Sequence, residues 1–182
     1  MKTNLVNSYL AVIVVSVLLS ACVKDTDFNQ ADDIVISPVV ELDLVHFDLP
    51  SIRFFDTIAS TPVLTVRDTT DLRFLNDEEV RLNLKRAEFY FKFTNGIQHE
   101  FQIDFQFLTP QDDLIYVSQT QVSPGTSSNP VVTEYTDNIE GALLEQLTLA
   151  EKLVISVTIP SSNANLEGNI KLQSKATYYL EF

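Results

Sequence analysis

The clearest pattern along the chain is an alternation of apolar and polar residues, which predicts β-strands. Apolar residues occupy every second position from Ala87 to Phe93, and again from Phe101 to Phe107, with mainly polar side chains between them. A period of two turns one face of a strand toward the core and the other toward solvent. Asn95-Gly96 separates the two segments, and this dipeptide favours a tight turn.

The length of that turn decides how the two phenylalanine rows meet. A two-residue loop would place the rows on opposite faces of a hairpin, because a slip of one residue flips a whole face. A three-residue loop from Thr94 to Gly96 pairs Phe93 with Ile97 and puts both rows on one face. We therefore predict a bulged three-residue hairpin at this position.

Further strands are predicted along most of the remaining chain. Apolar residues alternate from Ile170 to Phe182, so we expect the end of the sequence to pair in a sheet. Another strand runs from Leu153 to Ile159 and stops at Pro160. Weaker candidates are 34–36, 39–47, 63–66, 80–84, 114–117 and 131–135. The apolar phase changes at Lys85-Arg86, which predicts a bulge or a break there.

One short helix is predicted between these strands. Asp137 or Asn138 can cap it, and apolar residues at Ile139, Leu143 and Leu147 recur at a spacing of four. Eight or nine short strands, one helix and about 150 residues predict an all-β fold. We expect a single antiparallel β-sandwich, Ig-like in general architecture, over residues 34–182, with a closed barrel as the alternative.

The first 21 residues have the pattern of a secretory signal peptide. Lys2 precedes an apolar run from Tyr9 to Leu19, and the small residues Ser20 and Ala21 follow it. A permanent membrane helix requires about 20 apolar residues, and this apolar run is shorter.

Leu19-Ser20-Ala21-Cys22 resembles the lipobox of bacterial lipoproteins. This resemblance implies cleavage between Ala21 and Cys22 and lipidation of Cys22 with acyl chains such as palmitate. The alternative is an ordinary signal peptide with an incidental cysteine. Cys22 is the single cysteine of the chain, so no intramolecular disulfide can form, and a free exported thiol would be a liability.

The segment after Cys22 is polar and acidic, with Asp25, Asp27, Asp32 and Asp33. We predict a flexible tether over residues 22–33. Cys-Val-Lys-Asp-Thr-Asp is similar to the segment that follows the cysteine in Bacteroidota-type surface lipoproteins. That resemblance implies a lipid-anchored protein of the outer membrane, on the cell-surface side rather than the periplasmic side.

Net charge and composition exclude several functions. Cleavage after Ala21 would remove one lysine and no acidic residue, which changes the formal net charge from −13 to −14. Such a surface repels nucleic acid, so we expect no nucleic-acid partner. The four glycines are too far apart for a phosphate-binding loop. The two histidines, His46 and His99, lack the close spacing of a zinc site.

The other acidic residues form no recognisable site. They gather at 68–71, 76–79 and 112–113, in segments that we predict to be loops, without the spacing of a calcium loop. Solvated turn residues are the simpler interpretation. We therefore predict no catalytic residue, no cofactor and no metal ligand, and we expect the protein not to be an enzyme.

The remaining hypothesis is a role in binding. Tyr90 and Tyr179 stand among polar residues on the outer faces of predicted strands, a setting that suits a protein contact. The first hypothesis is an accessory or structural subunit of an outer-membrane complex in uptake, secretion or membrane-protein assembly, bound to outer-membrane protein partners. A surface glycan-binding module is the second hypothesis, and a hydrolase with unrecognised acidic residues is the third.

Overall fold

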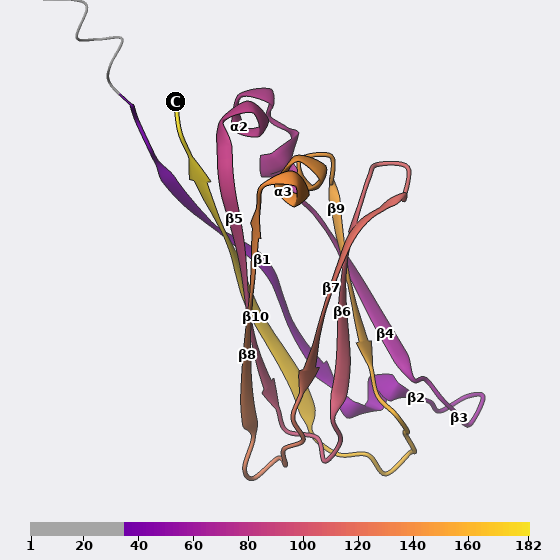
Figure 1. Cartoon of the computed structure of the whole chain (residues 1–182). Helices are drawn as coiled ribbons and strands as arrows, with labels where there is room; N and C mark the ends of the chain where they lie inside the picture. The colour runs from indigo at the N-terminus through magenta and orange to yellow at the C-terminus, as the bar shows by residue number, and fades with distance from the viewer. Residues whose placement is uncertain (1–34) are drawn as a thin grey trace, which may run out of the picture. The chain divides into compact units, whose positions relative to one another are not determined.

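Eight strands form two antiparallel four-stranded sheets that pack against each other (Figure 1). The first sheet contains, in spatial order, β1 (Val39–Pro50), β10 (Asn169–Leu180), β5 (Leu84–Asn95) and β8 (Val131–Glu140). The second sheet contains, in spatial order, β4 (Thr65–Asp71), β9 (Lys152–Thr158), β6 (Phe101–Leu108) and β7 (Leu114–Val122). The sheets stay separate within the described residues, so the β-sandwich prediction is confirmed and the closed-barrel alternative is not adopted.

This computed structural model describes residues 35–182. The predicted signal peptide, the lipidation site at Cys22 and the tether lie outside the described residues.

The connections between strands define the topology more closely than the sequence did. Consecutive long strands alternate between the two sheets, except that β6 and β7 pair directly with each other. Eight antiparallel strands connected across two sheets in this order form a jelly roll. The sandwich architecture was therefore predictable, whereas the jelly-roll connectivity emerges only from the structure.

Short elements join the strands. The 3₁₀-helix η2 (Ser51–Phe54) follows β1 and leads into a small hairpin of β2 (Phe55–Asp56) and β3 (Thr61–Pro62). β4 comes next in the chain, and a second 3₁₀-helix, η3 (Arg73–Asn76), follows β4. Two α-helices of six residues each, α2 (Glu78–Asn83) and α3 (Ala142–Leu147), lie at the same end of the sandwich (Figure 1). Among residues 35–182, none of the helices has the length and apolar character needed to cross a membrane.

The prediction of a strand at 80–84 is wrong, because residues 80–83 belong to α2 and only Leu84 belongs to a strand, as the first residue of β5. Asp77 caps the helix, and its carboxylate accepts hydrogen bonds from the backbone N–H groups of Glu79 at 2.9 Å and Val80 at 3.2 Å. The predicted irregularity near Lys85 is confirmed, since the pairing of β5 with β10 shifts register between Leu84 and Arg86.

The helix predicted after Asp137 is present but begins later. β8 continues to Glu140, so Asp137 and Asn138 are strand residues rather than caps. Gly141 is the N-cap of α3 and has a φ of +61°, a left-handed conformation that favours glycine. The chain therefore turns sharply at Gly141 from β8 into α3.

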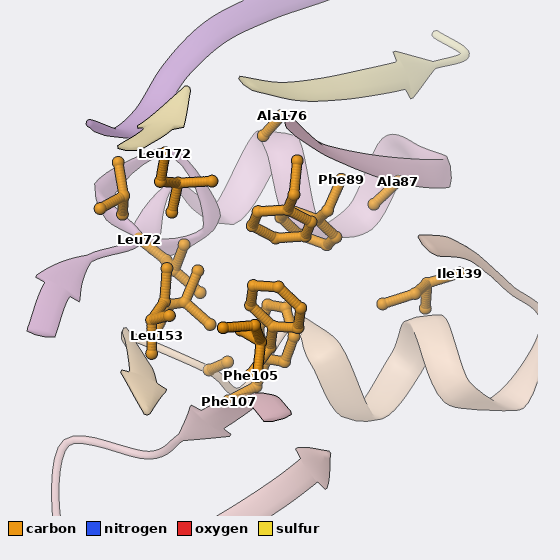
Figure 2. Packing of buried hydrophobic residues seen from close by; sticks show 14 of the residues in the cluster. Leu72, Ala87, Phe89, Phe105, Phe107, Ile139, Leu153, Leu172 and Ala176 are labelled. Carbon is orange, nitrogen blue, oxygen red and sulfur yellow. The ribbon is translucent and has the colours of Figure 1, made fainter. Parts of the chain in front are cut away.

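The predicted hairpin between the phenylalanine-rich strands is also wrong. β5 and β6 belong to different sheets, and residues 96–100 cross from one sheet to the other. Both rows do face the core, but they meet across it: the ring centroids of Phe91 and Phe105 are 3.9 Å apart, and those of Phe89 and Phe107 are 5.0 Å apart. Figure 2 shows Phe89 opposite Phe105 and Phe107 in this core.

The ends of the described chain lie at one end of the sandwich. Ile36 and Phe182 exchange backbone hydrogen bonds of 3.1 and 2.9 Å beside the start of β1. β1 is twelve residues long, which corresponds to about 40 Å of extended chain, and it ends at Pro50 opposite Asn169. The loops after β5, β7 and β9 therefore gather at the opposite end (Figure 1).

Candidate functional site

A cavity of about 570 Å³ lies between the loops at that opposite end. We call it the loop-end pocket. Its lining comes from the β5–β6, β7–β8 and β9–β10 loops and is mostly polar: Gly96, Gln98, His99, Thr126, Ser127, Ser128, Asn163, Asn165, Leu166 and Glu167.

The buried side chain of Asn95 holds two of these loops together. Its Nδ2 donates to the carbonyl oxygens of His99 at 2.8 Å and Ser123 at 2.9 Å. Its Oδ1 accepts from the backbone N–H of Ile97 at 2.8 Å. Asn95 is fully buried, so these three bonds satisfy an amide that would otherwise lose its contacts with water. The residue thus ties the β5–β6 loop to the β7–β8 loop.

Glycines allow the loop backbones beneath the pocket to approach each other closely. A Cβ atom on Gly125 would lie 2.0 Å from the carbonyl oxygen of Asn95, and one on Gly168 would lie 2.1 Å from that of Gly96. Gly168 also has a φ of +100°, which L side chains rarely adopt. Both positions therefore require glycine, and the close backbone packing gives the pocket a rigid floor.

Backbone hydrogen bonds extend this support to all three loops. Gly96 N–H donates to Asn169 at 2.8 Å, and Gly125 N–H donates to Ile97 at 2.9 Å. Ser51, at the end of β1, donates from its backbone to Gly168 and from its hydroxyl to the carbonyl of Leu166 at 2.6 Å. The pocket is therefore formed before any ligand binds, which reduces the entropy cost of binding.

The electrostatics of the pocket are mild for so acidic a protein. Glu167 supplies the one carboxylate in the lining and His99 the one imidazole, while the other polar groups are amides and hydroxyls. Next to the pocket, a hydrogen bond from Asn169 lowers the pKa of Asp48; burial opposes this effect, and Lys171 lowers the pKa further. The lining suits hydrogen bonding to a polar ligand or to a loop of another protein.

Tyr90 and Tyr179, the predicted interaction residues, lie on the outer face of the first sheet. They belong to the adjacent strands β5 and β10 but sit in different rows of that face. The guanidinium of Arg86 lies 3.7 Å from the centre of the Tyr179 ring. Partial burial and a hydrogen bond with Glu134 raise the pKa of Tyr90. Each tyrosine thus already packs against a charged neighbour.

Two other tyrosines fasten β7 to β8 across the gap between the sheets. The hydroxyl of Tyr116 donates to the carboxylate of Asp137 at 3.2 Å, and the hydroxyls of Ser118 and Tyr135 form a short hydrogen bond of 2.5 Å. Burial, followed by the charge of Asp137, raises the pKa of Tyr116. This cluster joins the two sheets along one side of the sandwich.

The histidines and acidic residues do not assemble into a site in the described part of the chain. His99 lines the loop-end pocket, whereas His46 lies beside Gln173 on the first sheet. Asp68 and Asp71 belong to β4 rather than to the loop that the sequence predicted. Residues 35–182 contain no group of three or more histidine, cysteine, aspartate or glutamate side chains placed to hold a metal ion.

The sequence does not predict the loop-end pocket. Gly96 predicts only a turn, and the wide spacing of the glycines excludes a phosphate-binding loop without indicating another role for Gly125 or Gly168. The local signal was the combination of glycine with asparagine and serine in three separate loops. Nothing in the linear sequence states that these loops meet, because about 30 to 45 residues separate one glycine from the next.

Comparison with known proteins gives no family. The sequence matches no protein-family model and no curated protein. Among solved structures, it is similar to a protein of Parabacteroides distasonis that is assumed to be secreted, with 11% identity and a TM-score of 0.45 over 63% of this chain and 38% of that one.

Two further similarities involve viral proteins. The infectious bursal disease virus VP2 subviral particle has 6% identity and a TM-score of 0.45, over 79% of this chain and 32% of that one. The enzymatically active domain of bacteriophage CBA120 tailspike protein 4 has 11% identity and a TM-score of 0.38, over 80% and 19%. The chain thus spans less than two fifths of each of these proteins, and the likeness assigns it no activity, ligand or partner.

Proposed function

We propose that this protein is a lipid-anchored, non-enzymatic accessory subunit of an outer-membrane complex, and that its loop-end pocket binds a protein partner. The observation that carries the proposal is the pocket itself, a preformed polar cavity of about 570 Å³ built from three loops. The resemblance of residues 19–22 to a lipobox supports the anchor.

The position of the pocket suits a tethered binding domain. Ile36, near the start of the described chain, pairs with Phe182 at the end of the sandwich away from the pocket. A chain anchored through Cys22 would therefore present its loops from the end that carries no tether. Two acyl chains on one cysteine give stable membrane attachment, whereas a single chain gives weak and reversible attachment.

The pocket lining suits a partner that inserts a polar loop. Gln98, Asn163 and Asn165 can each donate and accept hydrogen bonds, and the serine and threonine hydroxyls add to this capacity. Polar contacts of this kind are common in non-obligate protein interfaces. A rigid cavity would fix the position of the inserted loop, because the loops of the pocket need no rearrangement on binding.

The experiment compares partner capture by two variants of the lipidated full chain. Gln98→Trp places a large ring at an exposed position in the pocket, and we expect it to abolish co-purification of the partner from membranes in mild detergent. Gln111→Trp makes the same change at an exposed turn outside the pocket and should leave capture unchanged. Partners are identified by mass spectrometry of crosslinked cells.

Two results would contradict the proposal. If the wild-type protein is captured without any stoichiometric partner, the proposed accessory role is wrong. Equal loss of capture in both tryptophan variants would show that the pocket is not the contact, and circular dichroism would establish that both variants are folded.

Glycan binding is a second candidate, favoured by the same amide and hydroxyl lining, which matches the donors and acceptors of sugar hydroxyls. No tryptophan occurs in the chain, and no aromatic side chain lines the pocket. Binding of the wild type to a glycan array, lost in Gln98→Trp and kept in Gln111→Trp, would favour this candidate over a protein partner.

A further inference from the structure

The sandwich has four edge strands, and one of them differs from the rest in charge. β1 and β8 are the edges of the first sheet, and β4 and β7 are the edges of the second. An edge strand presents unpaired backbone N–H and C=O groups, so it can pair with another strand. Natural proteins commonly place charged residues on such edges to prevent this pairing.

Three of the four edges carry acidic residues. These are Glu41, Asp43 and Asp48 on β1, Asp68 and Asp71 on β4, and Glu134, Asp137 and Glu140 on β8. β7 has the sequence Leu-Ile-Tyr-Val-Ser-Gln-Thr-Gln-Val, without any charged residue, proline or glycine. A nine-residue uncharged edge is unusual in a chain with a net charge of −13.

β7 is also held in place and open on one side. It pairs with β6 on one side and, within residues 35–182, has no strand on the other. The hydrogen bonds of Tyr116 with Asp137 and of Ser118 with Tyr135 fix its inner face. Gln119 and Gln121 are exposed on its outer face, and Leu114 is 58% exposed.

The charge pattern of the four edge strands indicates which strand would pair with the free edge of β7. In an antiparallel pair of identical strands, each strand faces a copy of its own sequence. Self-pairing of β1 or β8 would bring acidic residues of two copies close together, and like charges on opposing residues are destabilising, although Lys171, Lys175 and Arg86 offset part of that charge. β4 also carries Arg67, so the charge of that edge is mixed. β7 is the edge at which two copies can meet without this repulsion, whereas a basic partner strand would favour one of the acidic edges.

Asp104, Asp137 and Glu140, which lie on strands near β7, do not oppose this arrangement. Asp104 of β6 is paired with Gln119, so two β6 strands would be separated by three strand spacings, about 14 Å. That distance exceeds the Debye length of about 8 Å at physiological ionic strength. On β8, Glu140 lies 3.7 Å from Arg86 and Asp137 accepts from Tyr116, so both carboxylates already have partners.

We propose that two copies of this chain pair through antiparallel β7 strands, which joins their second sheets into one eight-stranded sheet. The contact is isologous, with the same strand contributed by both copies, as in most symmetric dimers. It leaves the loop-end pocket of each copy free, so the proposal does not depend on the function proposed above.

The test introduces into β7 the charge that the other edges already have. The full lipidated chain is studied in density-matched detergent by sedimentation equilibrium, where the wild type should be dimeric. Gln119→Glu brings carboxylates near each other at the contact and should raise the dissociation constant by about tenfold or more. Gln173→Glu is the matched control, because it adds the same charge at an exposed position in the middle of the first sheet.

A mixture of variants gives a rescue. Gln119→Glu and Gln119→Lys should each dimerise weakly alone and should form mixed dimers when combined, because opposite charges then meet across the contact. A monomeric wild type overturns the proposal. So does a wild-type dimer that Gln119→Glu leaves intact, and so does equal weakening by Gln119→Glu and Gln173→Glu.

Discussion

At the residue scale, the glycines show how the absence of a single Cβ atom determines local structure. Gly125 and Gly168 let two pairs of backbones touch beneath the loop-end pocket. Gly141 differs, because its surroundings are open and its positive φ is the feature that favours glycine. The same substitution therefore has two different physical costs in this chain.

We expect Gly125→Ala to lower the free energy of unfolding by about 3 kcal/mol or more, because the new Cβ would lie 2.0 Å from a backbone oxygen. Gly141→Ala should cost less, about 1 to 3 kcal/mol, from backbone strain at its positive φ without a clash. Urea denaturation of both variants measures the difference. Equal losses would show that the pocket floor yields easily, and the proposed rigidity would then be wrong.

At the element scale, the sandwich is stabilised by aromatic rows that meet across the core. Phe105 of β6 stacks on Phe91 of β5 at 3.9 Å and lies 5.9 Å from the ring of Tyr135 on β8. One side chain therefore links strands of both sheets. Alternation predicts that Phe105 is buried, but its partners depend on which sheet each strand joins.

Truncation of Phe105 should destabilise the fold strongly. We expect Phe105→Ala to lower the free energy of unfolding by about 3 to 5 kcal/mol, because it leaves a cavity between the sheets. Phe182→Ala removes the same ring from a side chain that is 50% exposed, and it should cost less than about 1 kcal/mol. Chemical denaturation again provides the comparison, and similar losses for both variants would contradict the assignment of Phe105 to the core.

At the scale of the whole molecule, function depends on where the domain is held. The acidic segment 22–33 and the lipobox-like residues lie outside the described residues, so the proposed anchor rests on the sequence. The structure adds that the polar pocket is at the end of the sandwich opposite to the paired residues Ile36 and Phe182.

Cys22→Ser should release the protein from membranes, because the serine cannot be acylated through sulfur. Cells expressing the wild type and the variant are fractionated without detergent, and the protein is followed by immunoblotting. The wild type should sediment with membranes and the variant should be soluble. A variant that still sediments, while a soluble periplasmic marker does not, would exclude lipid anchoring through Cys22.

The structure departs from the sequence predictions mainly where the pairing of strands was at issue. Alternation correctly identified the strands around Phe91, Phe105 and Leu172, because each position depends only on its neighbours in the chain. It failed for the β5–β6 hairpin, since two apolar rows can share a core either side by side in one sheet or face to face across two. It also failed at 80–84, where the Asp77 cap starts a helix in a short segment with ambiguous periodicity.

The amino-acid sequence alone specifies which faces of the strands are apolar, the all-β class, the single cysteine and the acidic charge. These properties follow from residue types and their local spacing. The jelly-roll connectivity, the loop-end pocket and the uncharged edge of the second sheet arise only in the folded chain. Each of these depends on contacts between residues far apart in the chain, such as Asn95 with Ser123 and Gly168 with Gly96, and such contacts leave no periodic signal in the sequence.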